Sequence, residues 1–416
     1  MDRYEALPSV GSRKPRFFYG YIIVLIALSI QMISWGMIDS YGIFFKSILT
    51  EFGWSRATIS GAASLNILVS GLAGVIAGIL SDRFGGPRLV MTACGFLFGL
   101  GYLLMSQLNA IWQLYFLYGI VVGIGLSATD VVLLSTIARW FVKKRSMMSG
   151  IMKVGAGIGI FIMPLVINKL IFTYDWRTSC IILGTLALVF ITLTAQLLRR
   201  DPFQKGLLPD GEKTTIAASN NLTQEGLSLI AATHTRQFWM ICSIYLITYF
   251  CSMTILTHIT LHAIDIGISI TNATAVLSII GAASIVGRLV MGNVGDRIGS
   301  KQALTICFII LVAALSWLQL SKELWMLYLF SIVYGFPHGG CVTLISPMVA
   351  ELFGTRSQGA ILGTVVLSAT IGGAIGPFLA GWLFDINRSY QLAFLLCTAL
   401  SIIALMLASL LKQPAR

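Results

Sequence analysis

The sequence predicts an all-α membrane protein with twelve transmembrane helices. Three observations support this prediction: the composition, twelve long apolar stretches and an internal repeat. Apolar residues make up 57% of the 416 residues, charged residues make up 11%, and the mean hydropathy is +0.87. Soluble domains average about 45–50% apolar and about 25% charged residues. A large soluble helical protein fits poorly, because here the charge is confined to short segments between apolar stretches.

Each apolar stretch has about 20 residues or more, enough to cross the roughly 30 Å hydrocarbon core of a bilayer as a helix. The stretches lie near residues 18–45, 55–80, 87–107, 110–138, 146–172, 177–198, 237–263, 272–295, 301–320, 323–352, 357–384 and 389–411. Turn-forming residues such as Pro202, Pro209 and Asp210-Gly211 mark a polar linker. The chain therefore divides into a first unit at 1–198, a linker at 199–236 and a second unit at 237–416.

An internal repeat relates the two units. The turn Gly78-Ile-Leu-Ser-Asp82-Arg83-Phe-Gly85 recurs as Gly292-Asn-Val-Gly-Asp296-Arg297-Ile-Gly299, which places Asp82 and Asp296 214 positions apart. Three further pairs recur at offsets of 211 to 213 positions: Arg145-Ser146 with Arg356-Ser357, Pro164 with Pro377, and Leu114-Tyr115 with Leu327-Tyr328. Four pairs at nearly one offset indicate a duplicated unit of roughly 210 residues.

The repeated turns predict contacts that open and close. An aspartate such as Asp82 can accept hydrogen bonds from backbone N–H groups at the start of a neighbouring helix. Such a turn can latch two helices in one conformation and release them in another. We expect the latch to comprise Gly78, Asp82, Arg83, Gly292, Asp296 and Arg297. Glycines at 71, 74 and 78 recur at helical spacing and predict close helix packing.

The distribution of Lys and Arg predicts the orientation in the membrane. With a cytoplasmic start, 20 of the 28 cationic residues fall on the cytoplasmic side, six fall outside, and Lys153 and Arg288 lie within spans. We therefore expect a multi-pass protein of the cell membrane, a bacterial inner membrane, with both termini in the cytoplasm. The net charge of +12 fits anionic lipid headgroups. Nucleic-acid binding is not expected, because no basic face with stacking aromatics lies outside the membrane.

Polar residues within the spans are candidates for a binding site, because charge inside a bilayer is costly. Gln31 and Trp35 share a face of the first span, which is either packed or the wall of a cavity. Asp130 and Lys153 lie about 13 Å and about 12 Å from the cytoplasmic ends of their helices, at about 1.5 Å per residue. Asp130 is either a functional acid or a structural partner of Lys153. Lys153 itself either faces the interior or snorkels to the interface.

Arg288 is the candidate for binding an anion. Its guanidinium stays charged at any relevant pH and can form two parallel hydrogen bonds with a carboxylate. One helical turn earlier the residue is Ser284, so that position supplies no acid. An anionic ligand is one partner for this arginine, and a buried ion pair with Asp130 or another helix is the alternative.

Histidines mark two further places in the second unit. His258, His262 and Asp265 share one face of the seventh span. With one acid and no cysteine on that face, a metal site is disfavoured, and a solvated cluster that titrates near neutral pH is preferred. In the tenth span, Tyr334 and His338 flank a bend at Pro337, where His338 is either a site residue or a packing residue. The seven cysteines form no CxxC pair, and we expect no disulfide, metal or other cofactor.

The sequence resembles the major facilitator superfamily. Its two Gly-x-x-x-Asp-Arg-x-Gly turns, after the second and eighth spans, are similar to that superfamily's signature, and the resemblance covers the whole chain. More narrowly, the chain resembles the monocarboxylate-porter branch. The stretch from Trp140 to Gly155, an aromatic-Phe-x-basic-basic run followed by small residues, is similar to that branch's signature between the fourth and fifth spans. Residues 17–21 and 51–56 resemble its bacterial members.

The resemblance implies two six-helix bundles, with a substrate site between them near mid-membrane and alternating access by rocking. The first, fourth, seventh and tenth spans would line the cavity. The fifth and eighth spans would face each other across it, bringing Lys153 toward Arg288. In that branch an arginine of the eighth span, matched here by Arg288, holds the substrate carboxylate, and a proton travels with it. Some members have an acid where this chain has Ser284.

The leading hypothesis is a proton-coupled symporter of small monocarboxylates such as lactate or pyruvate, active as a monomer. The substrate-binding residues would be Arg288, Lys153, Trp35, Gln31, Tyr334 and His338, and proton coupling would involve Asp130, His258 and Asp265. The runner-up is an exchanger of small dicarboxylates such as oxalate, in which Lys153 and Arg288 each hold one carboxylate. A transporter-like sensor without flux is a third alternative. A membrane enzyme is disfavoured, because the sequence shows no nucleophile–base pair.

Overall fold

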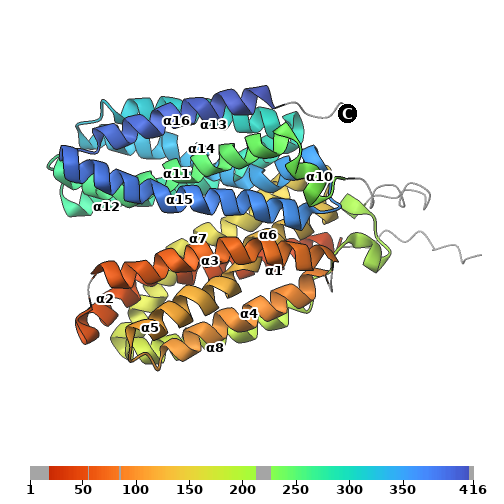
Figure 1. The fold of residues 1–416 in the computed structure, drawn as a ribbon, viewed down its shortest axis with the longest axis horizontal. Coiled ribbons are helices and arrows are strands. Elements are labelled where there is room, and N and C mark those ends of the chain that lie inside the picture. Colours follow the sequence, from red (N-terminus) through yellow and green to blue (C-terminus); the bar gives the residue numbers. More distant parts are fainter. Residues whose placement is uncertain (1–17, 55, 84–85, 212–225, 412–416) are drawn as a thin grey trace, which may run out of the picture.

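Figure 1 shows the computed structural model of the chain, which describes residues 18–54, 56–83, 86–211 and 226–411. Within these ranges, twelve helices are long and apolar enough to cross a membrane. The predicted all-α fold and its number of spans are therefore confirmed.

The first six spans form one bundle. Its elements are α1 (Gly20–Asp39), α2 (Tyr41–Phe52), α3 (Arg56–Arg83), α4 (Gly86–Met105), α5 (Ile111–Leu114), η1 (Tyr115–Val122), α6 (Gly123–Trp140), α7 (Arg145–Thr173) and α8 (Trp176–Ala195). The predicted end of the first span is wrong, because α1 ends at Asp39 and Ser40 separates it from α2. The fourth span runs through α5, η1 and α6, and η1 is a π-helical stretch that the apolar pattern did not reveal.

A linker and a second bundle follow. The linker contains η2 (Pro202–Lys205), η3 (Pro209–Gly211) and α10 (Leu229–Thr233). The second bundle comprises α11 (Arg236–Asp265), α12 (Ile270–Ile298), α13 (Ser300–Leu318), α14 (Leu324–Phe353), α15 (Gln358–Asn387) and α16 (Gln391–Leu410). The backbone N–H of Leu227 donates to the carbonyl of Phe353 at 2.9 Å, which ties the linker to this bundle.

The two bundles lie side by side in Figure 1, the first below in red to yellow and the second above in green to blue. The linker helix α10 lies at the right of the view, and α2 lies at the left. The linker end of the molecule is the one at which α3 and α12 terminate and α7 and α15 begin. The opposite end, where α1 ends and α3 begins, is the α2 end.

At the linker end, two helix pairs hold the bundles together: α3 with α15, and α7 with α12. A Cβ atom at Gly78 would lie 2.1 Å from the carbonyl oxygen of Gly359, and a Cβ at Gly150 would lie 2.5 Å from that of Arg288. Any side chain at these positions would overlap the facing backbone. The predicted close packing of the glycines at 71, 74 and 78 is confirmed. Gly78 packs against Gly359 of α15, a helix of the opposite bundle.

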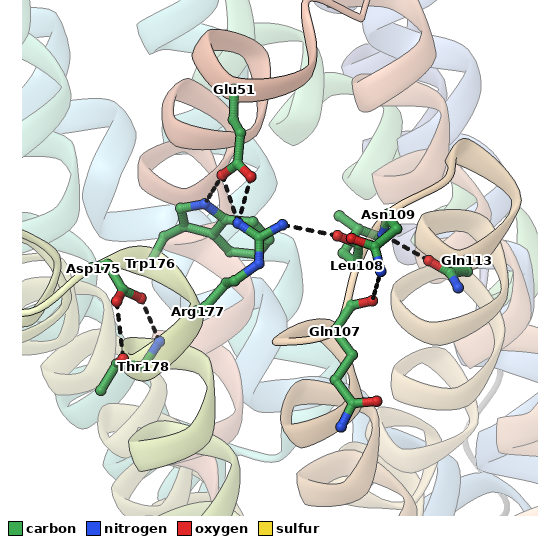
Figure 2. A network of polar contacts seen from close by, with 9 residues as sticks. All are labelled: Glu51, Gln107, Leu108, Asn109, Gln113, Asp175, Trp176, Arg177 and Thr178. Atoms are coloured by element: carbon green, nitrogen blue, oxygen red, sulfur yellow. Dashed lines mark hydrogen bonds and ion pairs between the residues drawn. The ribbon is translucent and has the colours of Figure 1, made fainter.

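At the α2 end, a polar network fixes α2 to the rest of the first bundle (Figure 2). Arg177 at the start of α8 pairs with Glu51 of α2 at 2.5 Å and donates to the Leu108 carbonyl at 3.0 Å. The Trp176 indole donates to Glu51 at 2.6 Å, and the Arg177 guanidinium lies 4.4 Å from the centroid of that indole. The hydrogen bonds from Arg177 and then Trp176 lower the pKa of Glu51. Every partner belongs to the first bundle, so this network does not join the two halves.

Candidate functional site

Three helices of the first bundle bring together a buried ion pair. Lys153 of α7 donates from Nζ to Oδ1 of Asp130 on α6 at 2.6 Å, and the two residues are 4% and 9% exposed. Gln31 of α1 donates to the same oxygen at 2.6 Å and to the carbonyl of Thr129 at 2.8 Å. Lys153 therefore faces the interior, and the snorkelling alternative is wrong. The alternative in which Asp130 is the partner of Lys153 is confirmed as a contact.

Arg288 lies across from this pair, on α12 of the second bundle. Its Nη1 donates to the backbone carbonyl of Lys153 at 3.1 Å, so α7 and α12 face each other as the resemblance implied. The residue is only 6% exposed. Its buried Nε has no hydrogen-bond partner, and among the described residues no acid forms an ion pair with it. The predicted alternative of an Arg288–Asp130 pair is wrong, because Asp130 is held by Lys153.

The charges of this cluster do not cancel. Asp130 compensates Lys153 at hydrogen-bonding distance, whereas Arg288 makes only a neutral contact with a carbonyl. Desolvating a guanidinium is costly unless an anion or several acceptors replace the lost water. The arrangement can therefore stabilise one bound anionic group at Arg288.

The α1 face adds polar and aromatic surface to the cluster. The ring centroid of Trp35 lies 6.0 Å from Lys153 Nζ, within the range of a cation–π contact. The buried atoms Gln31 Oε1 and Trp35 Nε1 have no hydrogen-bond partner. Buried polar atoms in proteins are seldom left unpaired. Together with Arg288 Nε, they provide one acceptor and two donors for a small polar ligand.

Two residues near the site were not predicted as site residues. Asp39 lies one turn beyond Trp35 on the same face of α1 and is exposed. Asp39 and Tyr249, which lies in the middle of α11, are both within electrostatic range of Arg288. The signal for Asp39 was its spacing of eight residues from Gln31, two helical turns on one face. A single tyrosine in an apolar helix carries no comparable pattern.

Tyr334 and His338 lie on α14 and contact each other. Nδ1 of His338 is 2.9 Å from the Ser252 hydroxyl of α11, and the Tyr334 and His338 rings stack with centroids 6.0 Å apart. Tyr334 is 1% exposed. His338 is thus hydrogen-bonded and packed, and it also lies within electrostatic range of Arg288.

His258 and Asp265 do not form one solvated cluster. His258 is 8% exposed, with Nδ1 3.3 Å from the Tyr390 hydroxyl and Nε2 3.0 Å from the Pro377 carbonyl. The prediction of a solvated histidine is wrong at this position, because α15 and α16 cover it. Asp265 is exposed at the end of α11. In the described part of the chain, no three His, Cys, Asp or Glu side chains are grouped so that they could hold a metal ion.

The two repeated turns make equivalent contacts between the bundles. Asp296 at the end of α12 accepts from the backbone N–H groups of Ser146 and Met147 at 2.7 and 2.9 Å, at the start of α7. Asp82 at the end of α3 accepts from Ala360 N–H at 3.0 Å, at the start of α15, and pairs with Arg139. The predicted hydrogen bonds from a neighbouring helix start are confirmed. Arg83 and Arg297 are exposed beside them, and Gly78 and Gly292 lie in the helix contacts.

The chain is similar to known transporters along most of its length. The family model for the Major Facilitator Superfamily matches residues 24–292 and 241–416. Monocarboxylate transporter 13 of Bos taurus is 27% identical over 410 residues, 95% of this chain and 88% of that protein. Monocarboxylate transporter 12 of Rattus norvegicus is 26% identical over 412 residues, 93% and 84% of the two chains. The structure of FucP, a transporter in its outward conformation, aligns with a TM-score of 0.74 at 13% identity, covering 95% and 100%, and shows the likeness of fold alone.

Proposed function

Since the chain belongs to the major facilitator superfamily, we propose that it is a carrier that transports a small monocarboxylate together with a proton by alternating access. One observation supports this most directly. Arg288 is buried between the bundles without an acidic partner among the described residues, whereas the other intramembrane cation, Lys153, is already paired with Asp130. One buried cation with no acid at ion-pair distance among the described residues matches one carboxylate. The names of the similar mammalian proteins, monocarboxylate transporters, agree with this charge count.

Substrate binding would use the fork of Arg288. A carboxylate accepts two parallel hydrogen bonds from a guanidinium, which fixes its plane as well as its position. The Nε that lacks a partner is one of the donors of such a pair. Trp35 offers an apolar ring for a short carbon skeleton, and Gln31 Oε1 offers an acceptor for a hydroxyl group. A two- or three-carbon acid with a polar group beside its carboxylate fits this set of contacts.

Proton coupling would follow from the Asp130–Lys153 pair. Protonation of Asp130 removes the charge that compensates Lys153, so the cluster gains one positive charge. An anion then binds more tightly, and by reciprocity a bound anion favours protonation of Asp130. Substrate and proton would in this way bind together and leave together, which is the thermodynamic requirement of symport. His258 and Asp265 remain alternative proton carriers that this scheme does not need.

The orientation completes the proposal. The linker end carries most of the Lys and Arg residues outside the spans, so it would face the cytoplasm. The bundles are in contact there through α3–α15 and α7–α12, which corresponds to an outward-facing arrangement. Release of the substrate to the cytoplasm would require both contacts to separate. In the α7–α12 contact, Arg288 packs against Gly150 and Gly157. The contact that closes the linker end would therefore also position Arg288.

Uptake into proteoliposomes tests the proposal. Labelled lactate, pyruvate and oxalate are offered to wild-type protein with and without an inward proton gradient. We expect lactate or pyruvate uptake that the gradient stimulates, and a loss of about 10- to 100-fold in Arg288→Lys, because the lysine keeps the charge but loses the charge-assisted fork. Arg236→Lys, an exposed arginine at the start of α11, is the matched control. Exchange of oxalate without a proton requirement, or wild-type uptake by Arg288→Lys, would exclude this function.

A further inference from the structure

A second cationic site lies at the linker end, away from Arg288. A cavity of about 510 Å³ opens where both bundles meet the linker helix α10. Its walls include Arg83 at the end of α3, Arg200 after α8 and Arg356 just before α15. Arg83 belongs to the first bundle, Arg200 lies at the start of the linker directly after α8, and Arg356 belongs to the second bundle. The cavity is therefore complete only while the bundles are in contact at this end.

The charges in this cavity are uncompensated. In the described ranges, no acidic side chain pairs with Arg83, Arg200 or Arg356. Asp82 also lines the cavity, but its two oxygens are taken by Arg139 and by the backbone N–H of Ala360. Three guanidinium groups around one space repel one another, and a multiply hydrogen-bonding anion would relieve that repulsion.

A neighbouring smaller cavity provides a contrast. It is lined by Arg88 and Arg199 as well as by Arg200. Arg88 donates to Gln196 Oε1 at 2.8 Å, and Arg199 donates to the carbonyls of Gln196 and Leu198 at 2.8 and 2.9 Å. These two arginines already have acceptors within the protein. The larger cavity is thus distinguished by guanidinium groups that are free to bind an external anion.

The larger cavity also has apolar lining residues. Ile79 of α3 and Leu229 and Ile230 of α10 line it, and the Ile230 side chain is 73% exposed. About one turn before Ile79 on α3, Ile76 is 60% exposed. A cationic cavity at the end of a span, bordered by exposed apolar side chains, matches a lipid in both of its parts: a phosphate for the arginines and acyl chains for the isoleucines.

From this arrangement we infer that the cavity binds the phosphate of an anionic phospholipid from the leaflet at the linker end, and that the lipid bridges the two bundles. Because Arg356 would move away from Arg83 and Arg200 when the bundles separate, the lipid binds the closed arrangement more tightly. A ligand shifts a conformational equilibrium by the ratio of its affinities for the two states. Anionic lipid therefore increases the population that is closed at the linker end, whatever substrate the protein carries.

Native mass spectrometry of the full chain in detergent tests lipid binding. Phosphatidylglycerol and phosphatidylcholine are titrated in parallel, and glycerol 3-phosphate and inorganic phosphate are added as soluble competitors. We expect selective retention of one phosphatidylglycerol. The triple variant Arg83→Gln/Arg200→Gln/Arg356→Gln should bind it on the order of 100-fold more weakly, about fivefold per arginine. Arg88→Gln/Arg199→Gln is the matched control and should bind like the wild type.

Each contrary result has a defined meaning. Equal binding of phosphatidylglycerol by the triple variant and the wild type would overturn the site. Displacement of the lipid by glycerol 3-phosphate at similar concentrations would show that a soluble phosphate compound is the ligand and would overturn the lipid assignment. If the triple variant does not fold, Arg356→Gln alone serves, with an expected loss of about fivefold.

A distance measurement tests the bridge. Spin labels at Val142→Cys and Lys301→Cys place one probe on each bundle near the linker end, and the native cysteines in the described ranges are buried. Pulsed EPR in phosphatidylcholine vesicles should show more of the short distance after phosphatidylglycerol is added. Arg356→Gln should abolish this response, and Arg88→Gln should preserve it. The same response in Arg356→Gln and wild type would contradict bridging.

Discussion

The α3–α15 contact and the α7–α12 contact are built from the same parts, but only the second contains residues of the candidate site. In each contact, an aspartate at the end of one helix accepts backbone hydrogen bonds at the start of the other: Asp82 from Ala360, and Asp296 from Ser146 and Met147. In each, glycines allow the helices to approach to backbone distance. The internal repeat relates α3 to α12 and α7 to α15. The α3–α15 contact and the α7–α12 contact are therefore equivalent under the repeat.

The two contacts differ in the residues that the glycines of α7 and α3 face. On α7, Gly150 meets the carbonyl of Arg288, and a Cβ at Gly157 would lie 2.7 Å from Arg288 Nη1. On α3, Gly78 meets the backbone of Gly359 and Gly71 meets Thr370, with no charged site residue between them. One contact therefore only closes the linker end, whereas the other closes it and positions the arginine. The duplicated sequence therefore has the same glycine and aspartate contacts in both halves, but the candidate binding residue Arg288 lies at only one of them.

The largest effects are expected from adding a methyl group at these glycines. Gly78→Ala and Gly150→Ala each force a Cβ against a facing carbonyl, and overpacking of this kind costs about 1–3 kcal/mol. We expect both to lower flux about tenfold or more by opposing closure. Only Gly150→Ala should also weaken equilibrium substrate binding, because it displaces the backbone of Arg288. Uptake and radioligand binding on the same preparations separate the two effects.

Gly281→Ala is the control for these variants. It adds the same methyl group to α12, and among the described residues no atom outside the backbone of α12 lies within 4 Å of the position that its Cβ would take. It should transport like the wild type. If Gly78→Ala lost as much affinity as Gly150→Ala, the two contacts would not differ in function.

A smaller effect is expected from Asp82→Asn and Asp296→Asn. Both should reduce flux and leave substrate affinity within a few fold, because neither aspartate contacts the site. Asp82→Asn should have the larger effect, since it leaves the buried Arg139 side chain, 8% exposed, without its anion. Asp296→Asn loses only one of the two side-chain oxygens that accept from the backbone N–H groups of Ser146 and Met147. The readout is the rate of conformational exchange at the linker end beside the uptake rate; a large loss of affinity with unchanged exchange would contradict a latch.

The sequence predicted the fold well because its signals are local. Twenty-residue apolar stretches define spans whatever their partners, and the repeated Gly-Asp-Arg turns mark both contacts between the bundles. The end of the first span was mispredicted because apolar residues continue past Asp39 into α2. Hydropathy cannot distinguish one long helix from two joined at Ser40.

The pairing of the site residues was less predictable because it depends on helix rotation. Asp130, Lys153 and Arg288 were all identified, but either cation could have met the carboxylate. Because α1, α6 and α7 pack closely together, Asp130 pairs with Lys153 and not with Arg288. The spacing of residues within one helix does not predict this pairing. His258 was expected in solvent because its partners, Tyr390 and Pro377, lie more than 100 positions away in sequence.

A moderate effect on pH dependence is expected from Lys153→Met, which tests the site at the α7–α12 contact. The variant keeps the length of the side chain and removes its charge, leaving Asp130 without its cation. Protonated Asp130 is then favoured, so the pH profile of lactate uptake should move to higher pH while part of the transport remains. Lys153→Arg keeps the pair and should keep the wild-type profile.

Two results would contradict this account of Lys153. Lactate uptake by Lys153→Met with an unshifted profile would show that Asp130 does not depend on Lys153. Strong oxalate exchange in the wild type that is lost in Lys153→Met would mean that Lys153 binds a second carboxylate, and the substrate would then be a dicarboxylate.

The smallest effect is expected at the α2 end, where Glu51 and Arg177 join elements of one bundle only (Figure 2). The pKa of Glu51 lies below its ordinary 4.5, chiefly because Arg177 hydrogen-bonds to the ionised carboxylate. The stabilisation is therefore complete above pH 4.5 and is lost as the pH falls through the lowered pKa. Both side chains are about a third or more exposed, so the pair should contribute at most about 1 kcal/mol. The thermal unfolding temperatures of wild type and Glu51→Gln should differ by about 1 °C at neutral pH and converge in acid. Glu323→Gln, at the same end of the second bundle, is the control and should show no such convergence.

Because the two contacts at the linker end are unaffected, uptake by Glu51→Gln should stay at the wild-type rate. A loss of flux as large as that of Asp82→Asn would show that the α2 end also takes part in the conformational cycle.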